Sequence, residues 1–115
     1  MKKQINSNRG ERIASKVQIL VAEILRDNYV DDKFISGVSL VGSQSHGGLS
    51  FIKLFYYTRA DDLKPVQKRL EEITKMVRFE LAQRIEQKYV PNIRFVYDDT
   101  LERANRIEKL LENIG

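Results

Sequence analysis

Cysteine is absent from this chain of 115 residues, and proline occurs only twice. Without cysteine the chain has no disulfide, no thiolate metal site and no thiol nucleophile. A protein of this length can bury a core that is stable without such cross-links. No apolar run is long enough to span a bilayer, and the N-terminal residues lack the apolar core of a signal peptide. We therefore expect a single domain over residues 1–115, a monomer in the cytoplasm without membrane association.

Residues that commonly carry catalysis are also scarce. The one histidine, His46, lies among glycines where we predict a solvated turn, and Ser43 and Ser45 form no triad with it because neighbours on an extended turn point in different directions. No GxxxxGK[ST] or GxGxxG phosphate-binding motif is present. We predict a non-enzymatic protein with no catalytic residue, metal site or cofactor, and keep a hydrolase based on His46 only as an alternative. Paired aspartates lie where caps and turns are expected, at Asp31/Asp32, Asp61/Asp62 and Asp98/Asp99.

The pattern of apolar residues predicts an α+β fold with a three-stranded sheet packed by helices. Asn8 and Glu11 have the spacing of a capping box, which predicts that the first helix begins there. Strand-forming residues on both sides of the segment GSQSHGG predict a hairpin with that segment as its turn. The expected elements are a helix over 8–28, strands over 35–41 and 49–58, a helical tract over 61–88, a strand over 92–97 and a last helix capped by Thr100.

The helical tract over 61–88 has an apolar side and a basic side. At about 100° per residue, the apolar side consists of Val66, Leu70, Ile73, Val77 and Leu81. The opposite side, here called the basic ridge, consists of Lys64, Lys68, Lys75 and Arg78. A straight helix would bring Arg84 onto the apolar side and Phe79 near the ridge, so we predict a kink or break in this tract. The element order is then α-β-β-α-α-β followed by a C-terminal helix.

Positive charge is concentrated in two parts of the chain. The net charge is +4, with five Lys and Arg against one Glu in residues 1–20 and eight against four acids in residues 64–94. Arg9, Arg12 and Lys16 lie beside the apolar stripe of the first helix and can face an anionic ligand. An ordinary solvated helix face is the alternative explanation of such charge. Clustering favours RNA, whose phosphates such side chains neutralise with release of counterions.

Three strand aromatics offer a second possible contact with RNA. Phe51, Phe55 and Tyr57 could stack on unpaired bases, as aromatic residues do in single-strand binders. We favour packing in the core, or cover by the last helix, as their role.

Three segments together resemble the ribosome-binding factor A family. Residues 90–111, VPNIRFVYDDTLERANRIEKLL, are similar to the family's VPxxRFxxD strand and the segment after it. Residues 48–57, GLSFIKLFYY, resemble its second strand, and residues 9–25, RGERIASKVQILVAEIL, resemble its opening helix. The resemblance covers nearly the whole chain in the right order.

This resemblance implies a type II KH-like domain and a role in ribosome assembly. The family binds the free small ribosomal subunit and its 16S rRNA late in maturation, and supports processing of the precursor 5′ end, especially in the cold. Its interhelical kink usually contains Ala-x-Gly, where this chain has Ile73-Thr74-Lys75. The RNA-binding residues then expected are Arg9, Arg12, Lys16, Lys64, Lys68, Lys75, Arg78 and Arg94, although Arg94 could equally be structural. A small KH-like module that binds other RNA or a protein partner is the alternative.

Overall fold

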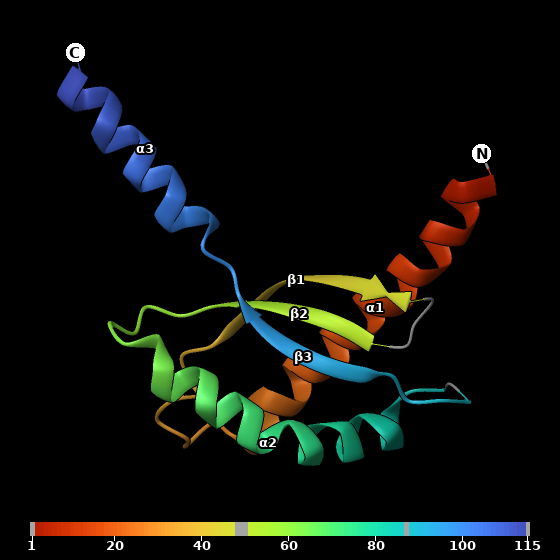
Figure 1. The fold of residues 1–115 in the computed structure, drawn as a ribbon. Coiled ribbons are helices and arrows are strands. Elements are labelled where there is room, and N and C mark those ends of the chain that lie inside the picture. The colour runs from red at the N-terminus through yellow and green to blue at the C-terminus, as the bar shows by residue number, and fades with distance from the viewer. Residues whose placement is uncertain (1, 48–50, 87, 115) are drawn as a thin grey trace.

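The structure is a computed structural model that describes residues 2–47, 51–86 and 88–114. These residues form three helices and three strands (Figure 1). The α+β class and the three strands are therefore confirmed, whereas the helical tract over 61–88 is one continuous helix and not two. The elements are α1 (Lys2–Asn28), β1 (Ser39–His46), β2 (Phe51–Tyr57), α2 (Leu63–Arg84), β3 (Asn92–Tyr97) and α3 (Thr100–Ile114).

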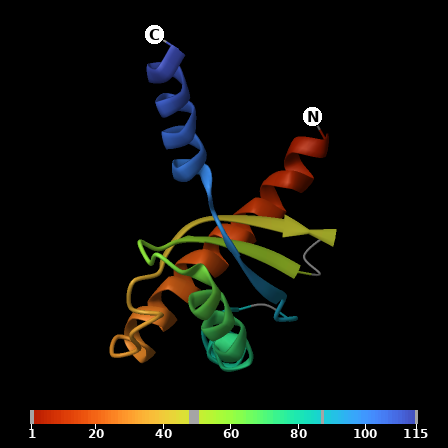
Figure 2. The same cartoon turned by 60° about the vertical axis from the view of Figure 1, so that its left-hand side comes forward.

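The three strands form one mixed sheet in the order β1-β2-β3. β1 and β2 pair antiparallel, while β2 and β3 pair parallel with Leu54 opposite Phe95. Parallel neighbours need a long crossover connection, which α2 provides. α1 packs chiefly against β1 and α2 against β3, and both helices lie on the same face of the sheet (Figures 1 and 2). Among the described residues, no helix layer covers the other face.

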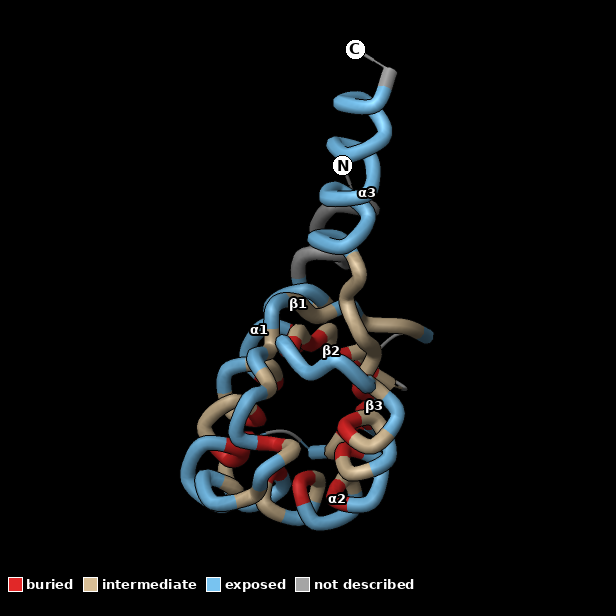
Figure 3. Tube along the Cα trace, turned by 90° about the vertical axis from the view of Figure 1, so that its left-hand side faces the viewer, coloured by how far each residue is buried: buried red, intermediate tan, exposed pale blue. Residues whose placement is uncertain are grey.

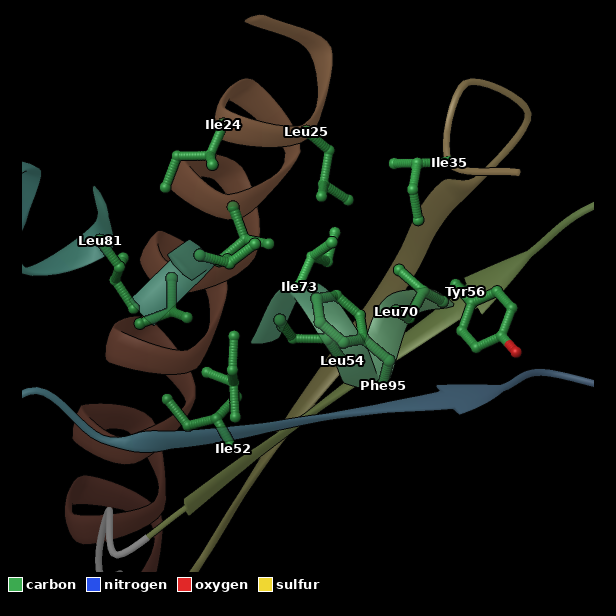
Figure 4. Packing of buried hydrophobic residues seen from close by; sticks show 14 of the residues in the cluster. Ile24, Leu25, Ile35, Ile52, Leu54, Tyr56, Leu70, Ile73, Leu81 and Phe95 are labelled. Carbon is green, nitrogen blue, oxygen red and sulfur yellow. The ribbon is translucent and has the colours of Figure 1, made fainter. Parts of the chain in front are cut away.

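The core lies between that sheet and the two helices (Figure 4). Strand residues alternate between the two faces of a sheet, and the buried residues of β2 are Ile52, Leu54 and Tyr56. The Tyr56 hydroxyl donates to Gln67 Oε1 at 2.6 Å, so the one polar atom of that ring is satisfied. The predicted apolar side of α2 is confirmed, because its buried residues are Val66, Leu70, Ile73, Val77 and Leu81.

α2 stays helical through the segment where a kink or a break was predicted. Asp62 caps its N-terminus by accepting the N–H of Lys64 at 3.0 Å. At Thr74 the side-chain hydroxyl donates to the carbonyl of Leu70 at 2.7 Å, a local bond that often bends a helix without ending it. Figure 1 shows the axis of α2 changing direction between its first and second halves. The prediction of two helices is wrong, because the backbone remains helical from Leu63 to Arg84 and bends between the two halves.

Two predicted boundaries near the N-terminal half are also wrong. α1 begins at Lys2, so Asn8 lies inside the helix and does not cap it. β1 extends to His46, and its Ser43 and Gln44 pair with β2 although they were expected in the turn. Cross-strand pairing with the strongly strand-forming β2 outweighs the weak strand propensity of serine and glutamine. Gly47, with φ of 55°, begins the connection. Residue 48 of the predicted turn and residues 49–50 of the predicted second strand lie outside the described residues.

α3 projects away from the sheet (Figures 1 and 3). Residues 101–113 are all exposed. Contacts at its start include a bond from the Tyr97 hydroxyl to Glu102 at 2.7 Å and an ion pair between Arg103 and Asp99 at 2.6 Å. The N–H of Thr100 donates to Asp98, so Asp98 supplies the cap that was predicted for Thr100. The expectation that this helix covers the strand aromatics is wrong.

Candidate nucleic-acid interface

Three lysines of the basic ridge lie on the solvent side of α2. Lys64, Lys68 and Lys75 are exposed, on the side opposite the buried residues of the same helix. Within residues 2–47, 51–86 and 88–114, none of the three forms an ion pair. Their ammonium groups are therefore accessible to the phosphates of a nucleic acid, and the ridge runs along most of the helix.

The ridge also contains the carboxylate of Glu71, which was not among the predicted site residues. Glu71 is exposed and lies three residues after Lys68 and four before Lys75, which places it on the same side of the helix. Its carboxylate accepts a hydrogen bond from Gln67 Nε2 at 2.9 Å. Gln67 Nε2 also donates to the Phe95 carbonyl at 3.0 Å, and this hydrogen bond connects α2 to β3. Glu71 lowers the positive potential of the ridge at its centre.

Arg78, the last residue of the ridge, holds the chain before β3. Its guanidinium donates from Nε to the Pro91 carbonyl at 3.2 Å and from Nη2 to the Val90 carbonyl at 3.1 Å. It is half-buried. These bonds give Arg78 a structural role that the sequence could not reveal, and only its remaining N–H groups can meet a phosphate.

The basic residues of α1 are exposed but belong to a different edge of the molecule. Arg9, Arg12 and Lys16 lie on the helix that packs against β1, whereas the ridge lies on the helix that packs against β3. β2 separates these two strands. α1 comes close to β1 at Gly10, where an added Cβ would lie 2.8 Å from Ser45 Oγ. The two groups of predicted residues therefore lie on two different helices.

Arg94 lies on a third surface, the uncovered face of the sheet. It is exposed, and its Cζ atom lies 4.6 Å from the centre of the Phe51 ring. A guanidinium over an aromatic face is held by a cation–π attraction. The predicted RNA-binding residues are therefore divided among α1, α2 and the outer face of the sheet.

His46 is not the solvated turn residue that was predicted. It ends β1, is half-buried, and its ring stacks on Phe51 with centroids 4.9 Å apart and planes 7° from parallel. Its Nε2 atom lies 3.2 Å from Gln44 Oε1.

Among the residues that the structure describes, no group of three His, Asp or Glu side chains is arranged to hold a metal ion. No helix among the same residues is able to cross a membrane.

Two further arginines of the basic block over 64–94 are engaged within the protein. Arg84 lies 3.6 Å from Asp27 and 3.9 Å from Glu23 of α1, which links the two helices. Arg69 Nε donates to Asp32 Oδ2 at 2.7 Å and so links α2 to the loop after α1. Neither was assigned to the ridge, and both neutralise acids of the chain. In the described part of the chain, two of the eight basic side chains of this block are therefore paired with acids of the same chain.

The Asp32 carboxylate makes stability depend on pH. Burial alone would raise the pKa of Asp32, but the bond from Arg69 and the backbone N–H groups of Phe34 and Ile35 outweigh it and hold the pKa below its usual value. A lowered pKa stabilises the fold above the unfolded value of about 3.9 and loses that contribution as pH falls.

We expect Asp32→Asn to lower the melting temperature at pH 7 and to flatten its decline below about pH 4. Melting curves from pH 2.5 to 7 measure this. The matched control is Asp31→Asn, which alters the exposed neighbouring residue. Equal pH profiles for the Asp32 variant and the unaltered protein would contradict the assignment.

The sheet topology and its two backing helices define a small α+β domain of the type II KH-like class. The fold is similar to the crystal structure of ribosome-binding factor A from Thermus thermophilus, with a TM-score of 0.68 and 11% identity over 76% of this chain and 93% of that one. The family model of ribosome-binding factor A matches residues 9–111. This chain belongs to the ribosome-binding factor A family.

Relatives from several bacteria have similar sequences over most of their length. Ribosome-binding factor A of Coxiella burnetii (strain Dugway 5J108-111) is 37% identical over 107 residues, which cover 92% of this chain and 89% of that protein. The protein of the same name from Streptococcus agalactiae is 32% identical over 111 residues, covering 94% and 95%. A homology model of the Thermus thermophilus factor, fitted into a cryo-EM map of a 30S complex, has a TM-score of 0.61 and 12% identity over 74% of this chain and 90% of that one.

Proposed function

We propose that this chain binds the free small ribosomal subunit and supports late maturation of its 16S rRNA, including processing of the precursor 5′ end. Membership of the ribosome-binding factor A family supports this role. A family member from Thermus thermophilus has been fitted into a map of a 30S complex. The structural observation that carries the proposal is the row of exposed ridge lysines, which make no ion pair within the described part of the chain.

The proposed mechanism is electrostatic clamping of one rRNA conformation. Lys64, Lys68 and Lys75 neutralise phosphates along the solvent side of α2, and each contact releases counterions from the RNA. Arg78 joins them through the N–H groups that do not hold Val90 and Pro91. The protein performs no chemistry itself, and nucleases act on the precursor end once the RNA is held. The need for such help is greatest in the cold, where wrongly paired RNA rearranges slowly.

The basic residues of α1 extend the proposed contact to a second segment of rRNA. Arg9, Arg12 and Lys16 face solvent beyond the β1 edge of the sheet. These residues lie on α1 and the ridge lies on α2, so the two groups can bind different segments of the RNA.

Sedimentation through sucrose tests the proposed partner. The protein is expected to travel with free small subunits and to stay near the top of the gradient when only assembled ribosomes are supplied. Binding through about six phosphates would weaken roughly a thousandfold between 50 and 200 mM salt. A protein that binds unrelated RNA equally well, or only a protein partner, would instead be a KH-like module of another kind.

A further inference from the structure

The face of the sheet turned away from α1 and α2 combines aromatic and cationic side chains. Alternation along β2 places Ile52, Leu54 and Tyr56 in the core, so the intervening residues turn outward. All four of these are half-buried. The rings of Phe51 and Tyr57 contact residues of the neighbouring strands. The outward residues of β2 are Phe51, Lys53, Phe55 and Tyr57.

Flat groups from three strands form a stack on this face. The His46 ring of β1 lies parallel to the Phe51 ring of β2, 4.9 Å away. From β3, the Arg94 guanidinium lies over the same ring at 4.6 Å. Phe51 is therefore contacted by both neighbouring strands. An imidazole and a guanidinium are flat groups on which a nucleic acid base can stack.

The charge of this face suits a polyanion. Lys53 and Arg94 are opposite each other in the β2–β3 register, with Gln44 opposite Lys53 on β1. Among the described strand residues on this face there is no carboxylate. Lys53 and Arg94 make no ion pair within the described part of the chain. Phosphates would neutralise both groups beside the aromatic rings.

The apolar residues of α3 fit this face less well than RNA does. α3 has exposed apolar residues but extends away from the sheet (Figure 1). Laying those residues over the strands would remove Lys53 and Arg94 from water, which is costly without an opposite charge on the sheet. The exposed apolar residues of α3 are Leu101, Ile107, Leu110 and Leu111.

We propose that the outer face of the sheet binds unpaired bases of single-stranded RNA, with the His46–Phe51–Arg94 stack and Phe55 receiving the bases and Lys53 the phosphates. This surface is distinct from the basic ridge, which contacts backbone phosphates only. The inference rests on the proposed function and adds to it a preference for single strands. One domain then holds a flexible rRNA segment on the sheet and a second RNA segment on α2.

Fluorescence anisotropy with two labelled RNAs tests this proposal on the full chain. One RNA is a single strand of about ten nucleotides without self-complementarity, within the usual site size of such surfaces. The other is the duplex that it forms with its complement. Phe51→Leu, which removes the ring but keeps an apolar side chain, is expected to weaken single-strand binding roughly 5- to 150-fold and duplex binding by less than about twofold. Phe51→Tyr should restore single-strand binding.

The matched control is Phe79→Leu, which removes an exposed aromatic ring from α2, the helix that packs on the opposite face of the sheet. It should leave single-strand binding unchanged, and melting curves check that every variant is folded. Equal binding of Phe51→Leu and the unaltered protein would overturn the sheet-face proposal even if the small subunit is still bound. If the unaltered protein does not bind the small subunit, the proposed function is overturned instead.

Photocrosslinking separates RNA from a protein partner at the same face. A photoreactive phenylalanine analogue replaces Phe55, and the full chain is bound to the small subunit before irradiation. Crosslinks to unpaired rRNA nucleotides support the proposal. Crosslinks to ribosomal protein, to rRNA duplex, or to the chain's own α3 would overturn it.

Discussion

Small-subunit binding should fall between about 100- and 500-fold at 100 mM salt when Lys64, Lys68 and Lys75 are all replaced by glutamine. Each lysine that neutralises a phosphate contributes about 0.7 to 0.9 to the slope of log K against log salt. Removing three contacts should therefore reduce that slope by about two to three units. The side chains are exposed and face away from the core, so the fold should remain intact. Binding isotherms over a series of salt concentrations measure both quantities.

A control with the same loss of charge separates the ridge from the net charge. Lys33, Lys88 and Lys109 are also exposed but lie outside α2. Replacing these three by glutamine should change the slope by less than about one unit, since they are not assigned to RNA. Equal weakening by both triple variants would show that only total charge matters. Glu71→Gln, which removes the carboxylate from the ridge, should act in the opposite direction and tighten binding.

Leu70→Ala should reduce the free energy of unfolding by about 3 kcal/mol, within the range of roughly 2–5 kcal/mol for such truncations. Leu70 is fully buried between the helices and the sheet (Figure 4). The variant loses the transfer free energy of the removed atoms and leaves a cavity that its neighbours fill only partly. Since domains of this kind are stable by about 5–15 kcal/mol, the loss is a large fraction of the total. Chemical denaturation at pH 7 measures it.

The comparison for this variant is Leu110→Ala, the same truncation at an exposed position. Leu110 is 60% exposed on α3. Truncation there should change the free energy of unfolding by no more than about 0.5 kcal/mol. A Leu110 effect as large as that of Leu70 would mean that α3 is packed in solution, contrary to the arrangement described above.

The core could be predicted from the sequence because apolar periodicity reports which side of an element is buried. Val66, Leu70 and Val77 were assigned to one side of a helix and are all buried. β3 was predicted with its observed bounds, since Pro91 and Asp98 flank a strongly strand-forming run. These features depend on local sequence alone.

Features that depend on distant partners could not be predicted. β1 continues through Ser43 and Gln44 because β2 offers them backbone partners, which no local propensity reveals. α2 continues through Thr74, although the bond from its hydroxyl to the Leu70 carbonyl favours a bend, because buried residues of α2 pack in the core both before and after this position. Arg78 was assigned by its charge and its side of the helix, yet two carbonyls before β3 occupy part of its guanidinium.

Glu71 is a different kind of omission. Its position on the ridge follows from the same helical spacing that located the lysines, so the sequence contained the signal. A pattern of clustered positive charge points to the lysines and not to the acid between them. Lys53 gives no separate signal, because aromatic residues dominate the strand around it.

The parallel pairing of β2 with β3 sets an order in which the chain can complete its fold. β1 and β2 are separated by only a short connection and can pair as soon as both have been synthesised. β3 must wait until the whole of α2 has been made, because its partner lies on the far side of that crossover. Until then Ile52 and Leu54 have no neighbour on one side, and the nascent chain exposes an unpaired strand edge. Closure of this long-range pairing should therefore limit the folding rate.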